Sequence, residues 1–169
     1  MKHIALAVTV LCLVFAPLSG ALAQETVTIY PRLTHGTVYV NAGTDIVLHA
    51  GWAACTRGLI PQYLSAVNID LGINDDQVFF DGNSPYWTPA IEIPGAPYLA
   101  YCLAGDRQSA WGVYWDYPIG ALDAGNYVIS YRETFTHRVV DGADNDGDGF
   151  LDSWKGTFTE NTFTIVVVE

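Results

Sequence analysis

The stretch 141-DGADNDGDGFLD-152 places five aspartates within twelve residues, with no lysine or arginine among them. So many carboxylates stay ionised at low free-energy cost only if solvent and salt screen them or a bound cation collects them. Asp144, Asp146 and Asp148 occupy alternate positions. A loop that bends back on itself brings alternate side chains to one point, and Gly149 permits the sharp turn. The spacing therefore favours a cation site over a loop that is merely solvated.

The ligand types predict which cation binds. Carboxylate and carbonyl oxygens are hard ligands, and a site rich in them favours Ca²⁺, because Mg²⁺ keeps more of its water and takes fewer protein ligands. We expect one calcium ion bound by the side chains of Asp144, Asp146, Asp148 and Asp152 and by the backbone carbonyl of Phe150, with Asp141 as a further candidate ligand.

The same segment, D-G-x-D-x-D-x-D-G-x-x-D, resembles the calcium loops of EF-hand proteins, dockerins and thrombospondin type 3 repeats, and its form is most similar to the last group. In such loops an apolar residue at position 8, here Leu151, anchors the loop to the core. An EF-hand has a bidentate glutamate at position 12, where this chain has Lys155. Neither flank looks helical. The resemblance therefore implies a calcium loop carried on a β-hairpin, with a dissociation constant of ~10⁻⁴–10⁻³ M and a structural role.

The elements that hold this loop are predicted to be strands. Short β-branched and aromatic runs recur between Gly, Pro, Asn and Asp, and no long segment has helical periodicity. Apolar and polar side chains alternate in several runs, which is typical of antiparallel strands with one packed face and one wet face. We expect an all-β fold, an antiparallel β-sandwich, with strands near 25–30, 36–40, 45–53, 63–73, 76–80, 97–103, 111–116, 126–139 and 156–168, and a bulge near Glu160–Asn161.

Residues 122–127, LDAGNY, run directly into a strand and resemble the tyrosine corner of immunoglobulin-like and fibronectin-type sandwiches. The resemblance implies an immunoglobulin-like fold in which the Tyr127 hydroxyl hydrogen-bonds to upstream backbone. It also makes 126–139 and 156–168 the last two strands, paired as a hairpin with the calcium loop between them. The cysteines do not sit on the strand after the corner, so the strand order stays open.

Residues 1–23 have the pattern of a secretory signal peptide, with an apolar run from Ile4 to Phe15 and the small-x-small triplet Ala21-Leu22-Ala23. We expect residues 24–169 to form a single β-sandwich domain that is secreted or held at the cell surface. The apolar run is too short to span a membrane, and no later stretch approaches the ~20 apolar residues that a spanning helix needs. Membrane insertion is therefore not expected.

The charge balance is strongly acidic, with 18 acidic and 7 basic residues and a formal net charge of −11. Nucleic-acid binding requires clustered Lys and Arg to neutralise phosphates, so it is not expected. Apart from Cys12 in the leader, the chain has only Cys55 and Cys102. In an oxidising compartment such a pair predicts one disulfide. A zinc site that includes His49 is the weaker alternative, because no metal-ligand spacing supports it.

The aromatic residues offer a second kind of binding site. Tyr86 and Trp87, inside the turn-like segment 81-DGNSPYWTP-89, are candidates for an exposed platform that stacks on a glycan, whereas Trp52 and one of Trp111 or Trp115 are expected to fill the core.

Catalysis has little support in the sequence, and we do not expect an enzyme. Glu133 and His137 share the predicted packed face of their strand, and burial of the two as a pair is the only acid/base arrangement that the pattern offers. The sequence therefore predicts a secreted calcium-binding β-sandwich module with a structural, adhesion or binding role, with an extracellular glycan or protein as its partner. A carbohydrate-binding domain and, less well supported, a secreted hydrolase are the alternatives.

Overall fold

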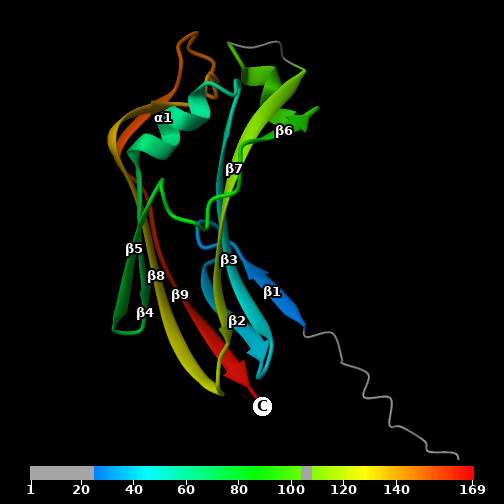
Figure 1. Cartoon of the computed structure of the whole chain (residues 1–169), viewed down its shortest axis with the longest axis vertical. Helices are drawn as coiled ribbons and strands as arrows, with labels where there is room; N and C mark the ends of the chain where they lie inside the picture. The colour runs from blue at the N-terminus through cyan, green and yellow to red at the C-terminus, as the bar shows by residue number, and fades with distance from the viewer. Residues whose placement is uncertain (1–24, 104–107) are drawn as a thin grey trace, which may run out of the picture.

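The computed structural model describes residues 25–103 and 108–169, and these residues are mostly β-strands (Figure 1). The predicted signal peptide lies outside the described residues. Among the described helices, none has the length and apolar character needed to cross a membrane. The elements in chain order are β1 (Thr26–Ile29), β2 (Gly36–Asn41), β3 (Asp45–Ala54), α1 (Leu59–Ala66), β4 (Val67–Ile73), β5 (Asp76–Asp81), β6 (Ile91–Pro94), the 3₁₀ helix η1 (Pro97–Tyr101), β7 (Ser109–Ala121), β8 (Gly125–Val140) and β9 (Ser153–Val168).

The strands form two sheets that enclose a common apolar core. One sheet has the order β1-β3-β7-β6, and the other has the order β2-β9-β8-β4-β5. Both sheets are mixed, because β1 pairs with β3 and β2 pairs with β9 in parallel, while the other pairs are antiparallel. The all-β prediction is confirmed, but the prediction of purely antiparallel sheets is wrong. Parallel pairing is possible here because neither pair is joined by a hairpin: β2 lies between β1 and β3 in the chain, and β3 to β8 lie between β2 and β9.

Period-two alternation fills the core as the sequence predicts. Every second residue of β3 is buried, and Trp52 and Trp115 are both buried, at 6% and 0% exposure. Trp52 stacks on Tyr63 with ring centroids 4.9 Å apart, so the core between the sheets is largely aromatic at this level.

The predicted terminal hairpin is present. Strands β8 and β9 pair in antiparallel register over most of their length, with the 141–152 segment between them. The Tyr127 hydroxyl donates a hydrogen bond of 3.0 Å to the Asp123 carbonyl oxygen, as the tyrosine-corner resemblance implied. The predicted bulge lies at Phe158, which the pairing skips between Thr157 and Thr159, close to the expected position.

Two predicted strands are wrong in part. Residues 63–66 end helix α1, because Ile60, Tyr63 and Ala66 recur at three-residue spacing and bury one helical face. Residues 97–101 form η1 because Pro97 fixes a backbone angle suited to the first turn of a helix. The short strand β6 was not predicted.

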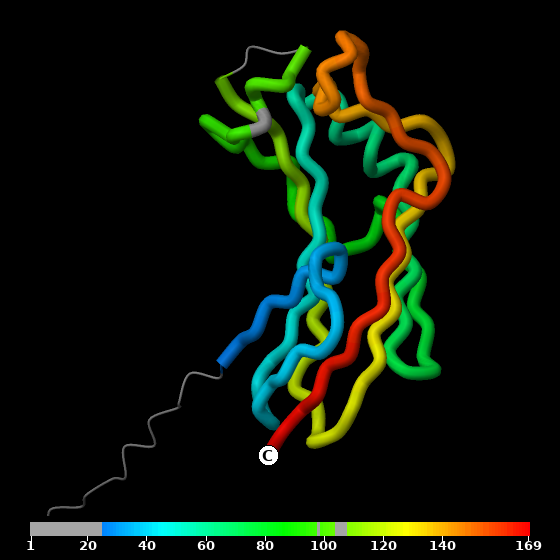
Figure 2. Tube along the Cα trace, turned by 180° about the vertical axis from the view of Figure 1, so that it is seen from behind, coloured from blue at the N-terminus to red at the C-terminus, as the bar shows by residue number. Residues whose placement is uncertain are grey.

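The acidic segment lies at one end of the molecule. Figures 1 and 2 show the 141–152 segment (orange) at the same end as α1 and η1, whereas the C-terminus lies at the opposite end. The disulfide between Cys55 and Cys102 is present, as predicted, with Cα atoms 5.7 Å apart, and it joins the segment that follows β3 to the end of η1. The acidic loop, α1 and the disulfide are therefore neighbours.

Candidate metal centre

The base of the acidic loop is held by backbone hydrogen bonds to both halves of the disulfide region. The Cys55 N–H donates to the Asp141 carbonyl oxygen at 2.6 Å, and the Asp144 N–H donates to the Tyr101 carbonyl oxygen at 2.8 Å. Cys102 and Ala143 form an isolated antiparallel bridge. Ala143 is fully buried in a small apolar cluster with the two cysteines. The loop therefore starts from a fixed base.

Gly142 allows this close approach. Its φ is +87°, a backbone conformation that glycine adopts far more readily than other residues. A Cβ at this position would lie 2.9 Å from Cys55 Cβ and 3.0 Å from Leu59 Cδ1. The glycine thus lets the loop pack directly against the disulfide and the start of α1.

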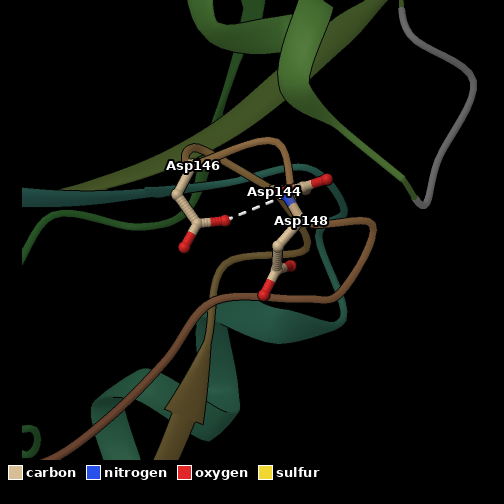
Figure 3. A group of neighbouring side chains, drawn as sticks. All are labelled: Asp144, Asp146 and Asp148. Atoms are coloured by element: carbon tan, nitrogen blue, oxygen red, sulfur yellow. Dashed lines mark hydrogen bonds between the residues drawn. The ribbon is translucent and has the colours of Figure 1, made fainter.

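Three of the predicted ligands converge. One carboxylate oxygen from each of Asp144, Asp146 and Asp148 lies within 4.8 Å of the others, and Figure 3 shows the three residues in the same part of the loop. Asp144 is buried, while Asp146 and Asp148 are exposed. Three carboxylates at this separation can hold a metal ion in principle, because one cation can lie within bonding distance of an oxygen from each.

Asp144 is held in place by the loop backbone. Its Oδ1 accepts hydrogen bonds from the N–H groups of Gly147 at 2.7 Å and Asp148 at 3.1 Å, and its Oδ2 accepts one from Gly149 at 2.8 Å. Burial tends to raise the pKa of Asp144, but these backbone donors outweigh that effect and lower the pKa below its ordinary value. The carboxylate at the first loop position is thus kept charged and oriented.

Asp152 and Asp141 do not join the three converging carboxylates. Asp152 Oδ2 accepts hydrogen bonds from the backbone N–H of Asn145 at 2.9 Å and from its side-chain amide at 2.6 Å. Asp141 Oδ1 accepts a bond of 2.8 Å from the Ala143 N–H. Burial, and to a lesser degree the charge of Asp152, raise the pKa of Asp141, while hydrogen bonds from Ala143 and Asn145 oppose that rise. These two carboxylates brace the base of the loop.

The two large apolar residues of the loop, Phe150 and Leu151, are not anchors. Phe150 is 73% exposed and Leu151 is 39% exposed, so the anchoring role that the resemblance implied for Leu151 is wrong in this structure. The buried Ala143 and the hydrogen-bonded base of the loop provide the attachment instead. The Phe150 N–H donates to Asp148 Oδ1 at 2.8 Å, which fixes the backbone next to the predicted carbonyl ligand.

Asn145 is the residue of this site that sequence reasoning missed. It lies between the first two ligand positions and holds Asp152 away from them. The D-N-D spelling offered a signal, because an asparagine flanked by acidic residues has two amide donors for a neighbouring carboxylate.

The predicted aromatic platform lies at the edge of the core. Tyr86 and Trp87 are both partly buried, and the Trp87 ring meets Tyr63 edge-on at 5.6 Å. The Trp87 indole N–H donates to the Asp81 carbonyl oxygen at 2.9 Å. Tyr86 packs edge-on against Phe80 at 5.6 Å. The two rings therefore fix the segment after β5 to the core and do not form an exposed flat pair.

The predicted pairing of Glu133 with His137 is wrong. His137 is exposed, because the pairing of β8 with β9 is irregular between Phe135 and Val139 and the alternation of β8 breaks there. Glu133 is fully buried, and its partner is Arg32, which donates through Nε at 2.8 Å and through Nη2 at 2.6 Å. Arg32 comes from the turn between β1 and β2, far away in sequence.

Two tyrosines complete the surroundings of Glu133. The hydroxyls of Tyr63 and Tyr131 donate to its carboxylate at 3.0 Å and 2.8 Å. Burial, followed by the negative charge of Glu133, raises the pKa of both tyrosines above its ordinary value. Arg32 also donates to the Gly51 carbonyl oxygen at 2.5 Å. These hydrogen bonds link β3 to β8 across the core, so we assign the cluster a role in holding the two sheets together.

No known protein-family model matches this chain, and no curated protein matches it. Among solved structures, the chain is similar to the cysteine protease inhibitor EhICP2 from Entamoeba histolytica, with 10% identity and a TM-score of 0.36 over 87% of this chain and 99% of that chain. A likeness this distant supports no conclusion about fold type or function.

Proposed function

We propose that this protein is an exported β-domain whose 141–152 loop binds one calcium ion and uses it to order one end of the domain. The observation that carries the proposal is the convergence of Asp144, Asp146 and Asp148 within 4.8 Å, in a loop whose spacing matches known calcium loops. The disulfide supports an oxidising, extracellular setting.

Binding requires only small changes in the loop. Asp144 is already oriented by three backbone donors, and its Oδ2, which accepts only one of them, retains lone-pair capacity for an ion. Asp152 reaches the ion if its side chain leaves Asn145, and the Phe150 carbonyl supplies a further oxygen. Water completes the coordination, as is common for Ca²⁺, which takes about 6–8 oxygen ligands.

The expected role is structural. The base of the loop is hydrogen-bonded to the segments that carry Cys55 and Cys102, so ordering the loop also restrains the disulfide region. At free calcium about ten times the dissociation constant, linkage stabilises the folded chain by only ~1.4 kcal/mol. That free energy is enough to order a loop, and the two-sheet core does not depend on it.

Calorimetry tests the proposal directly. Wild-type protein should bind about one equivalent of Ca²⁺ with a dissociation constant of ~10⁻⁴–10⁻³ M. Asp146→Ala should remove most of the binding heat. Glu92→Ala is the matched control, because it deletes an exposed carboxylate on β6, outside the loop, and should leave binding unchanged.

Two results would contradict the proposal. One is the absence of binding heat together with identical melting of the wild type in calcium and in chelator. The other is equal loss of binding in Asp146→Ala and Glu92→Ala, which would indicate diffuse attraction of Ca²⁺ by the overall negative charge. Equal affinity for Mg²⁺ would instead contradict the choice of calcium as the ion.

A further inference from the structure

The outer face of the second sheet carries a polar trough that the calcium loop does not explain. A hollow of about 640 Å³ lies over β4 and β5 and is lined by Asn68, Asp70 and Phe79, among others. A second hollow of about 540 Å³ shares Asn68 with the first and continues along α1 past Leu64. A third, of about 240 Å³, shares Asp70 and extends over β8 and β9. The three hollows therefore adjoin one another, and we refer to them together as the trough.

The floor of the trough follows from strand register. Asp70 lies opposite Phe79 on β5 and opposite Arg132 on β8. Asn68 lies opposite Asp81 on β5. Because alternate residues of a strand share a face, the side chains of Asn68 and Asp70 point away from the core, whereas their neighbours on β4 are buried.

One wall of the trough is rigid. Asp81 accepts hydrogen bonds from the Asn83 backbone and side-chain amides at 2.8 Å and 3.3 Å. A Cβ at Gly82 would lie 1.8 Å from the Leu64 carbonyl oxygen, so this segment packs directly against α1. Trp87 binds the Asp81 carbonyl oxygen through its indole N–H. A preformed wall of this kind lowers the entropic cost of ligand binding.

The lining combines an exposed ring with paired polar groups. Phe79 is 69% exposed, although it lies beside the polar row formed by Asp70 and Arg132. Arg132 donates to Asp70 through Nε at 2.8 Å, and its Nη2 contacts the same carboxylate oxygen. Ligand sites combine apolar contact surface with a few placed polar groups, and this hollow offers both.

We propose that this trough binds a neutral polysaccharide chain. The C–H face of a sugar ring packs against the exposed face of Phe79, because aromatic rings present a negative face to such groups. Carboxylate and amide groups of Asp70, Asn68 and Asn83 bind sugar hydroxyls, which donate and accept in pairs. The three adjoining hollows extend from α1 over β4 and β5 to β8 and β9, so a chain of linked rings has a surface to follow, and their acidic lining disfavours an anionic polymer.

The test uses the full secreted chain in a pull-down with insoluble cellulose, chitin, xylan and mannan, together with an array of neutral and acidic oligosaccharides. The wild type should be retained on at least one neutral polymer. Phe79→Ala should lower the affinity by about tenfold, because one stacking contact is lost. Tyr39→Ala is the matched control, because it removes an aromatic ring of 71% exposure from β2 at the opposite edge of the same sheet.

Binding should be the same in calcium and in chelator, since the trough residues lie outside the 141–152 loop. This separates the proposal from the calcium function, because either can fail alone. Absence of retention on every neutral polymer, retention on acidic glycans only, or equal effects of Phe79→Ala and Tyr39→Ala would each overturn it. So would peptide capture by the same residues without glycan binding, which would assign the trough to a protein partner.

Discussion

The protein holds negative charge in two contrasting ways. In the core, the single carboxylate of Glu133 is 0% exposed and receives four hydrogen bonds, two of them from the guanidinium of Arg32. In the 141–152 loop, five aspartates lie together and receive hydrogen bonds from backbone N–H groups and from Asn145. In the described part of the chain, no ion pair involves a loop aspartate.

The two regions differ in the source of the positive charge that compensates their carboxylates. Glu133 carries its counter-ion within the fold, so its contribution does not depend on the solution. The loop keeps its carboxylates close together with only partial dipolar compensation, so its stability depends on what the solution supplies. Under the proposed function, a calcium ion from the solution supplies the positive charge that the loop lacks.

The largest expected effect tests the buried cluster around Glu133, in which Arg32 supplies the compensating charge. Glu133→Gln leaves Arg32 inside the protein without its charged partner, and breaking a buried ion pair from one side costs about 3–5 kcal/mol. Denaturant unfolding should show this loss with and without calcium. Asp70→Asn, which breaks the more exposed pair with Arg132, is the control and should cost no more than about 1 kcal/mol. Similar costs for the two variants would show that the Glu133 cluster is not specially stabilising.

The next effect appears at high pH and comes from Tyr63 and Tyr131. Burial and the charge of Glu133 raise both pKa values above the ordinary value of 10.0. Below pH 10 the two buried tyrosines contribute fully to the free energy of unfolding. This contribution is lost as the pH rises further, because the two tyrosines then ionise in the unfolded chain but not in the folded chain. Each tyrosine should then lower the free energy of unfolding by up to about 1.4 kcal/mol per pH unit.

Spectroscopic titration of tyrosinate measures this directly. Tyr63 and Tyr131 should ionise only together with unfolding, because burial and the charge of Glu133 raise the pKa of both. Tyr39→Phe changes an exposed tyrosine outside this cluster and should leave the ionisation step that accompanies unfolding unchanged. Free ionisation of all tyrosines before unfolding would show that the Glu133 cluster opens to solvent.

The contrast also explains what the sequence could predict. The loop ligands are local, so alternate spacing identified Asp144, Asp146 and Asp148, which the structure brings together. Local periodicity likewise predicted the burial of Trp52, and the tyrosine-corner resemblance implied the terminal hairpin. The partner of Glu133 could not be predicted, because Arg32 lies 101 residues away and reaches Glu133 only through the crossing of the chain between the sheets.

Even within the loop, a local hydrogen-bond partner that the spacing does not reveal decides where a predicted ligand lies. The spacing treated Asp152 as a ligand, but Asn145 offers it two donors at short range, and the side chain follows them. The exposure of Leu151 has a different, long-range cause. The base of the loop is already fixed by long-range backbone bonds to the disulfide region, so no apolar anchor is needed.

The smallest expected effect tests the 141–152 loop, whose compensating charge is proposed to come from the solution. The sign of the change in stability should reverse between chelator and calcium. Asp148→Asn removes one charge but keeps an amide oxygen that can accept the hydrogen bond from the Phe150 N–H. In chelator, relief of repulsion with Asp144 and Asp146 should leave stability unchanged or raise it by up to about 0.5 kcal/mol.

In saturating calcium the same substitution should destabilise the protein relative to the wild type by up to about 1.4 kcal/mol, because the ion loses a charged ligand and the linkage contribution falls. Paired melting curves in calcium and in chelator measure both signs on one sample. Glu133→Gln must keep the same sign in the two conditions, since its counter-ion is Arg32. A constant sign for Asp148→Asn as well would mean that the loop is only a solvated acidic turn, and the distinction between internal and external compensation would then be lost.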